Sequence, residues 1–238
     1  MNVFDLSILW FVSTLTHRSE TLDTLIVRAV SNNLIKGGIL MALFWWAWAA
    51  RDDERFPKRE YLLLGFGLSI FAIVLARVVA LSLPFRTRPL HTPDLHFQLP
   101  YTMDPSFLET WSSFPSDHAV VFSCLTATIW MVSRSLGIAA AIFVFVVVFL
   151  PRIYTGLHYP TDILAGAALG CAVFSLTRIG RLRATLARPA LRWMEKQPGP
   201  FYGLLFLATF ELAELFKTLR IMAQPVTHLI KPLLQGLP

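Results

Sequence analysis

Three short segments of this chain contain residue types that bind anions and transfer protons. They are Phe85–Pro89, Phe114–His118 and Arg152–Asp162, and together they hold several arginines, two histidines and aspartates. Arginine presents a fork of donors that matches two oxygens of a phosphate group. Histidine can transfer a proton or attack as a nucleophile. These residue types therefore predict chemistry on a phosphate group.

The second segment has the features of a helix start. Pro115 suits the first turn of a helix because its missing N–H costs nothing there. The N–H groups of Ser116, Asp117 and His118 would then point outward at the positive end of the helix dipole. This arrangement predicts an anion site, with the His118 side chain in the same turn and able to pass a proton.

The third segment places a carboxylate beside a histidine. Pro160 marks another helix start, and Asp162 lies in its first turn, four residues after His158. A carboxylate at this spacing can hold one imidazole nitrogen and leave the other free to attack, as in catalytic triads. The spacing therefore favours a pair in which Asp162 orients His158.

Each of these features also has an ordinary structural interpretation. A lone histidine in a membrane helix usually makes a helix–helix hydrogen bond. A lone Arg-Pro near the end of a span is usually an anchor followed by a helix break. The combination at one membrane face favours a functional site, because ionisable residues at such depth are costly. Charged residues elsewhere keep the structural interpretation: Arg77 as a pair within the bundle, His91, Asp94, His96, Asp104 and Glu109 as a solvated loop, and Glu211 and Glu214 as the wet end of the last helix.

The composition indicates a membrane protein that is all-α. Of 238 residues, 55% are hydrophobic and only 15% are charged, which leaves too little polar surface for a soluble domain of this length. The net charge is +6, but the basic residues lie between apolar segments. That pattern indicates membrane topology and anionic lipids as partners rather than nucleic acid. Cys124 and Cys171 lie inside apolar stretches, which favours small buried hydrophobes.

Apolar runs predict a helical bundle with five to six transmembrane helices. The candidates are Leu34–Ala50, Leu62–Leu83, Ala119–Val132, Leu136–Leu150, Ile163–Leu176 and, weakened by two glutamates, Phe201–Phe216. Residues 1–31 are predicted to form helices at the membrane interface or packed against the bundle. The whole chain, 1–238, reads as one domain: 60–176 as its core, 177–199 as a basic loop and 200–238 as a final helix and tail.

The basic residues also predict the orientation. They gather in segments 51–60 and 177–199 and at Arg134, which fall on one side of the membrane in a five-span count. The positive-inside rule places these segments in the cytoplasm. Segments 84–118 and 151–160, which carry the candidate site, would then face the periplasm or exterior. The acidic run at 52–54 lies on the cytoplasmic side with no histidine or cysteine nearby, so no metal site is predicted there.

The candidate segments, in this order, resemble the type-2 phosphatidic acid phosphatase family, which shares its core with vanadium haloperoxidases and glucose-6-phosphatase. The pattern of that family is K-x6-R-P, then P-S-G-H, then S-R-x5-H-x3-D. The matching residues are Arg88 and Pro89, then Pro115, Ser116 and His118, then Arg152, His158 and Asp162. The resemblance covers roughly residues 60–176.

The resemblance implies a mechanism that uses neither a metal ion nor another cofactor. His158 would attack phosphorus and Asp162 would orient it, while His118 would protonate the leaving oxygen and then activate water. Arg88, Arg152 and the N–H groups near Ser116 and Asp117 would hold the phosphate oxygens.

Three positions depart from the family pattern. Leu81 stands where the family has its lysine, Asp117 replaces the glycine, and Pro151 replaces the serine. Arg86 or Arg77 is expected to supply the missing charge. The Asp117 carboxylate would repel an anion unless it is turned away.

The expected function is hydrolysis of a lipid phosphomonoester or diphosphate at the outer face of a bacterial inner membrane. Undecaprenyl diphosphate is the preferred substrate by analogy with the family. One alternative is a lipid phosphotransferase that uses the same histidine. Another is a non-catalytic protein that binds phospholipid headgroups, although binding alone does not require both histidines and Asp162.

Overall fold

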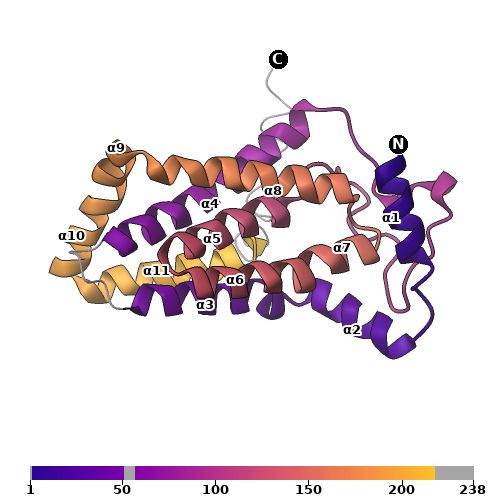
Figure 1. Cartoon of the computed structure of the whole chain (residues 1–238), viewed down its shortest axis with the longest axis horizontal. Coiled ribbons are helices and arrows are strands. Elements are labelled where there is room, and N and C mark those ends of the chain that lie inside the picture. The colour runs from indigo at the N-terminus through magenta and orange to yellow at the C-terminus, as the bar shows by residue number, and fades with distance from the viewer. Residues whose placement is uncertain (1, 51–56, 218–238) are drawn as a thin grey trace, which may run out of the picture.

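The computed structural model describes residues 2–50 and 57–217, and this part of the chain is helical and free of β-strands. Figure 1 shows an elongated bundle whose helices run mainly along one axis. The predicted all-α membrane fold is confirmed. Three parts of the predictions lie outside the described residues: the basic residues Arg51 and Arg55, the acidic run at 52–54 and the tail after residue 217.

The helices follow one another along the chain with short connections, except for the long segment between α4 and α5. Their bounds are α1 Val3–Ser13, α2 Glu20–Ser31, α3 Ile39–Ala49, α4 Pro57–Ser82, α5 Asp117–Val132, α6 Arg134–Phe143, α7 Leu150–Tyr154, α8 Pro160–Ser175, α9 Gly180–Leu182, α10 Arg188–Lys196 and α11 Pro198–Ala213. Wider π-helical turns precede α3 (Leu34–Gly38), join α6 to α7 (Val144–Phe149) and precede α10 (Arg183–Ala187).

Three helical segments of the described chain are long and apolar enough to cross a membrane. They are Pro57–Ser82, Arg134–Tyr154 and Pro160–Arg178. Segments Glu20–Ser31 and Leu34–Ala49 together would make a fourth span, bent by 71° at their junction. The chain is therefore an integral membrane protein. The number of spans, five to six, remains a prediction. Helix α5, for example, is a predicted span but has 16 residues, fewer than the roughly 20 that a span needs.

Helices α4, α5 and α8 form the centre of the bundle, and small residues set their spacing. A Cβ atom added to Gly166 of α8 would lie 2.8 Å from the carbonyl oxygen of Ser116, and one added to Gly170 would clash with the Val120 carbonyl. Only glycine permits this close approach. It brings the first turn of α8 beside the first turn of α5, where the Ser116 N–H donates to the Asp162 carbonyl at 3.3 Å.

The N-terminal helices pack against the end of the bundle that holds the long loops. Helix α1 contacts α7 and α8, and α2 contacts α7. Leu9 of α1 shares a buried cluster with Ala119, Ile153 and Ile163. Both helices exist as predicted, and α1 lies at one end of the molecule in Figure 1, opposite α10. Its acidic residue, Asp5, is fully buried.

The segment 177–199 was predicted to be a basic loop, and this prediction is wrong. The structure makes most of it helical, through α9, a π-helical turn and α10. The reason is an amphipathic pattern: Leu191 and Met194 are buried on one face of α10, while Arg192 and Lys196 are exposed. Arg188 donates to Glu60 of α4 at 2.8 Å.

Candidate active site

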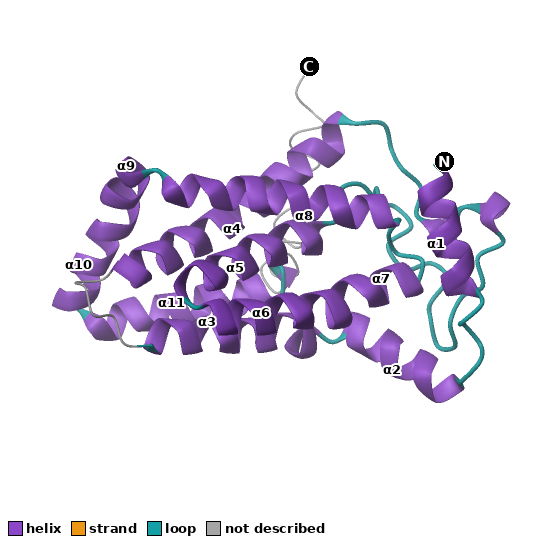
Figure 2. Ribbon diagram, viewed as in Figure 1, coloured by secondary structure: helices purple, strands orange, loops and turns teal. Residues whose placement is uncertain are grey.

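The predicted site residues meet at the end of the bundle where the loops gather. Figure 2 shows these loops, in teal, around α1. The connection between α4 and α5, the connection between α7 and α8 and the first turns of α5 and α8 supply many of the polar groups. Others come from α4, α7 and the π-helical turn before α3.

His158 is held in one tautomer by a main-chain carbonyl. Its Nδ1 lies 2.8 Å from the carbonyl oxygen of Ser113 and 3.6 Å from Oδ2 of Asp162. A carbonyl can only accept, so Nδ1 must carry the proton and Nε2 keeps a free lone pair. The predicted pairing with Asp162 is therefore a longer contact, and the Ser113 carbonyl, which sequence reasoning missed, makes the direct hydrogen bond.

Burial keeps the His158 side chain neutral. The side chain is almost fully buried, and this burial lowers its pKa to about 4. The nearby Asp162 carboxylate opposes the shift, and the charge of Arg88 adds to it. A neutral imidazole with an unprotonated Nε2 is the form of histidine that can act as a nucleophile.

Arg88 is a buried cation whose partners carry no charge. Its guanidinium donates to the carbonyl oxygens of Leu157 at 2.5 Å, Trp111 at 3.2 Å and Ser112 at 3.3 Å. Its Nη1 also lies 3.4 Å from Nε2 of His158. Burial lowers the pKa of Arg88 to about 10, so it stays charged at neutral pH. The Asp162 carboxylate is close enough to act on this charge, but the acceptors that contact the Arg88 guanidinium are carbonyl oxygens. Such a cation beside the imidazole of His158 can bind an anion.

Arg152 and Ser116 occupy different surroundings, although both were expected at the phosphate. Arg152 is buried, donates to the Val148 carbonyl at 3.3 Å and lines the same cavity as His118. The N–H of Ser116 was expected to bind a phosphate oxygen, but it donates to the Asp162 carbonyl instead. Its buried hydroxyl has no partner among the described residues.

Asp117 is paired with an arginine from the second predicted span. Its carboxylate accepts from Nε of Arg77 at 2.8 Å and also from Nη2 of the same side chain. The Arg77 guanidinium lies 4.8 Å from the centre of the Trp111 ring. Both charged side chains line a cavity with His118, so the negative charge of Asp117 is compensated there by Arg77.

Arg86 does not reach this cavity, which corrects its predicted role in phosphate binding. Its Nη1 pairs with Oδ1 of Asp162 at 2.5 Å, and its Nη2 pairs with Oδ2 of Asp5 at 2.8 Å. The guanidinium also lies 4.1 Å from the centre of the Tyr159 ring. Two buried carboxylates thus neutralise Arg86.

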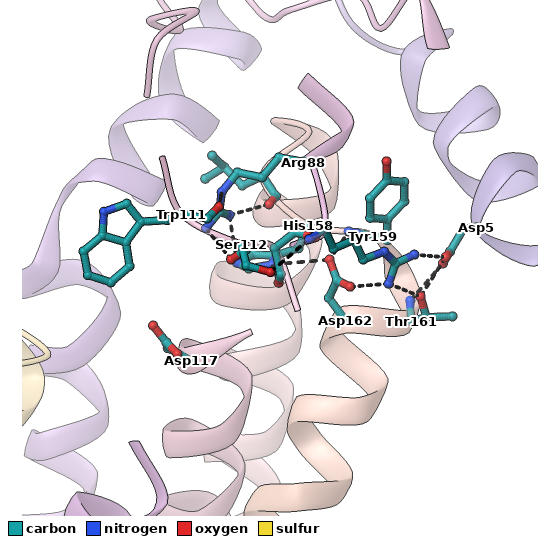
Figure 3. A network of polar contacts seen from close by, with 12 residues as sticks. Asp5, Arg88, Trp111, Ser112, Asp117, His158, Tyr159, Thr161 and Asp162 are labelled. Atoms are coloured by element: carbon teal, nitrogen blue, oxygen red, sulfur yellow. Dashed lines mark hydrogen bonds and ion pairs between the residues drawn. The ribbon is translucent and has the colours of Figure 1, made fainter. Parts of the chain in front are cut away.

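Asp5 completes a group that sequence reasoning missed, which we call the brace: Asp5, Arg86 and Thr161. Asp5 accepts from the Thr161 N–H at 2.9 Å and from its hydroxyl at 2.7 Å. Figure 3 shows Asp162 between Asp5 and Thr161 on one side and His158 on the other. The one sequence signal was an acidic residue inside an apolar helix, which requires a partner when buried.

The cavity beside the histidines has two lobes. Both lobes are lined by Leu108, Trp111, His118, His158 and Leu215. The Arg77 lobe, of about 310 Å³, extends to Arg77, Arg88 and Asp117. The Lys36 lobe, of about 510 Å³, extends to Asn33, Lys36, Arg152, Glu214 and Lys217. Among residues 2–50 and 57–217, no group of three or more histidines, cysteines and carboxylates is placed to hold a metal ion.

The model of the PAP2 superfamily matches residues 61–185, more than half of the chain. The chain belongs to the PAP2 superfamily. This confirms the resemblance predicted from the three segments. The matched region contains the long loops, both histidines and the central helices α4, α5 and α8.

Several bacterial PAP2 relatives are similar to this chain. Lipid A 1-diphosphate synthase of Escherichia coli is 28% identical over 57% of this chain and 56% of its own length. Decaprenylphosphoryl-5-phosphoribose phosphatase of Mycobacterium tuberculosis is 33% identical over 49% of this chain and 58% of its own length. Undecaprenyl-diphosphatase BcrC of Bacillus subtilis is 23% identical over 67% of this chain and 75% of its own length. The chain thus spans little more than half the length of the first two relatives.

A solved structure is also similar to this PAP2 chain. It is the crystal structure of a transmembrane PAP2-type phosphatidylglycerolphosphate phosphatase from Bacillus subtilis. It is 22% identical, covers 73% of this chain and 82% of its own, and gives a TM-score of 0.49.

Proposed function

We propose that this chain is a membrane lipid phosphatase that forms a phosphohistidine on His158. The observation that carries the proposal is the pair formed by His158 and Arg88. The neutral imidazole has its unprotonated nitrogen at Nε2, which faces Nη1 of Arg88 at 3.4 Å. The other acceptors that contact this arginine are neutral carbonyls. Such a pair can both bind a phosphate group and attack its phosphorus.

In the proposed first step, Nε2 of His158 forms a bond to phosphorus as the bond to the leaving oxygen breaks. His118 gives its proton to that oxygen. In the second step His118 takes a proton from water, and the hydroxide attacks the phosphohistidine and releases inorganic phosphate. Arg88 and Arg152 hold the phosphoryl oxygens while negative charge is redistributed among these oxygens.

A lipid diphosphate is the proposed substrate, with undecaprenyl diphosphate as the first choice. The support is the similarity to a protein named undecaprenyl-diphosphatase and to other relatives whose names contain lipid phosphates. A site in an integral membrane protein also fits a substrate that stays in the bilayer.

The test is phosphate release by the purified chain from a panel of lipid phosphates and diphosphates. We expect release from at least one lipid diphosphate, unaffected by EDTA, and none with His158→Ala. Transfer of the phosphate to a lipid acceptor without release would favour the phosphotransferase. Headgroup binding without turnover by the wild type would favour the non-catalytic alternative, and either result would contradict the proposal.

We also propose that the site faces the periplasm or the exterior of an inner membrane. The basic residues of α10 and the preceding turn lie at the opposite end from the site. A cysteine at exposed Gln98 should react with an impermeant reagent added to cells, and one at exposed Thr185 should not. Both variants need Cys124 and Cys171 replaced, and the reverse labelling would contradict the orientation.

A further inference from the structure

The phosphate site lacks the cation that the family pattern places before Arg88-Pro89. Leu81 occupies that position, and its side chain is 86% exposed on the outside of α4. Arg86 is neutralised by two carboxylates, and Arg77 is paired with Asp117. These segments therefore bring no further uncompensated cation to the histidines.

Lys36 is a buried lysine that enters the site from a distant segment. It lies in the π-helical turn Leu34–Gly38, and its side chain is 5% exposed. Its Nζ donates to the carbonyl oxygen of Val30 at 2.5 Å, and among the described residues this is its one hydrogen-bond acceptor. An ammonium has three N–H donors, so two of them are left for a ligand.

The Lys36 lobe holds more positive than negative charge. Lys36, Arg152 and Lys217 line it, and Lys36 and Arg152 are close enough for their charges to repel. The one carboxylate that lines the lobe among the described residues is Glu214, which accepts from Asn33 at 2.5 Å. Lys36 and Arg152 are buried, while Lys217 is exposed. Two buried cations beside one carboxylate are costly unless an anion joins them.

Arg88 and Lys36 line different lobes of the cavity, and both histidines line both lobes. Arg88 lies beside Nε2 of His158, where the attacked phosphorus would sit. Within the shared cavity the charge of Lys36 acts on His118, whereas the cations that act on His158 are Arg88 and Arg152. His118 is the proposed donor to the leaving oxygen, so Lys36 lies on the leaving-group side.

We propose that Lys36 binds the second phosphate of a lipid diphosphate, the one that departs with the lipid. This inference rests on the proposed function. The departing group of a lipid diphosphate is a charged lipid phosphate, whereas that of a lipid monophosphate is a neutral alcohol after protonation. A cation on this side therefore helps diphosphate cleavage and contributes little to monophosphate cleavage.

The test compares a polyprenyl diphosphate with the matching monophosphate. Lys36→Met keeps the length of the side chain and removes its charge. It should lower kcat/KM for the diphosphate by about tenfold to hundredfold, the loss of one charge-assisted contact. For the monophosphate the loss should stay below about threefold. Lys196→Met, a change at an exposed lysine of α10, is the control and should change neither value.

A binding measurement separates this role from a structural one. Methylenediphosphonate should bind wild-type protein and protect it against thermal unfolding, and Lys36→Met should weaken this binding about tenfold while leaving phosphate binding unchanged. Lys36→Arg retains the charge and should keep the preference for the diphosphate. Equal losses on both substrates, or no loss on the diphosphate, would overturn the inference. A wild type inactive on every lipid would instead overturn the proposed function.

Discussion

Arg86 and Arg88 are two residues apart, yet they belong to regions with opposite electrostatic character. In the brace, Arg86 meets the carboxylates of Asp5 and Asp162. In the cavity, the described residues that contact the Arg88 guanidinium offer it carbonyl oxygens and the imidazole of His158. The first arginine has its charge compensated within the protein, and the second keeps its charge for a ligand.

The difference shows that the partners of an arginine decide its use. A guanidinium between two buried carboxylates fixes their positions and adds little to anion binding. A guanidinium held by carbonyls is equally well positioned and remains attractive to a phosphate. Asp162 lies between the two regions, so the brace can hold the first turn of α8 while the cavity binds the substrate.

The largest difference should appear when each arginine is removed. Arg88→Ala should lower kcat by about 100-fold to 1,000-fold, as loss of an oxyanion donor does elsewhere. Arg86→Ala should lower kcat by less, about tenfold, but should destabilise the protein because Asp5 and Asp162 lose a buried partner. Steady-state kinetics and thermal unfolding in detergent check both. Equal kinetic losses with equal stability would contradict the division of roles.

A milder change to the brace should give a smaller effect. Asp5→Asn keeps the size of the side chain and one acceptor for Thr161 but removes the charge that faces Arg86. We expect kcat to fall by a few-fold, about the effect of 1 kcal/mol, with KM unchanged. Asp94→Asn, at an exposed loop position, is the matched control. A raised KM with normal kcat would place Asp5 in substrate binding instead.

The smallest effect concerns pH. The buried His158 has a pKa of about 4, so it stays neutral and reactive down to that pH. The acid limb of kcat/KM should therefore lie near pH 4 to 5, once the substrate's own phosphate titration is subtracted. Because this pKa is lowered, the folded state binds fewer protons than the unfolded state below about pH 6.5, and the contribution of His158 to stability falls as pH drops. If the acid limb of kcat/KM instead lay at pH 6.5 and came from a group of the enzyme, this result would contradict a buried neutral His158.

Local spacing predicted much of this site. Pro115 and Pro160 indicated two helix starts, and α5 begins at Asp117 and α8 at Pro160. The contact of Asp5 with Thr161 joins residues 156 positions apart, and no periodicity or motif records such a contact. Lys36 was hidden in the same way, because its role depends on how the first predicted span packs beside Arg152. The hydrogen bond that occupies the Ser116 N–H arises from the glycine-mediated approach of α8 to α5.

The central claim is that His158 takes the phosphoryl group and His118 handles the protons. Its most direct test is to trap the phosphoenzyme with a phosphorus-labelled nitrophenyl phosphate, whose leaving group needs no proton. In His118→Ala the phosphohistidine should form and persist, because no base activates water, and peptide mapping should place the label on His158. In His158→Ala no label should appear. Label on His118, or on no histidine in either variant, would contradict the account.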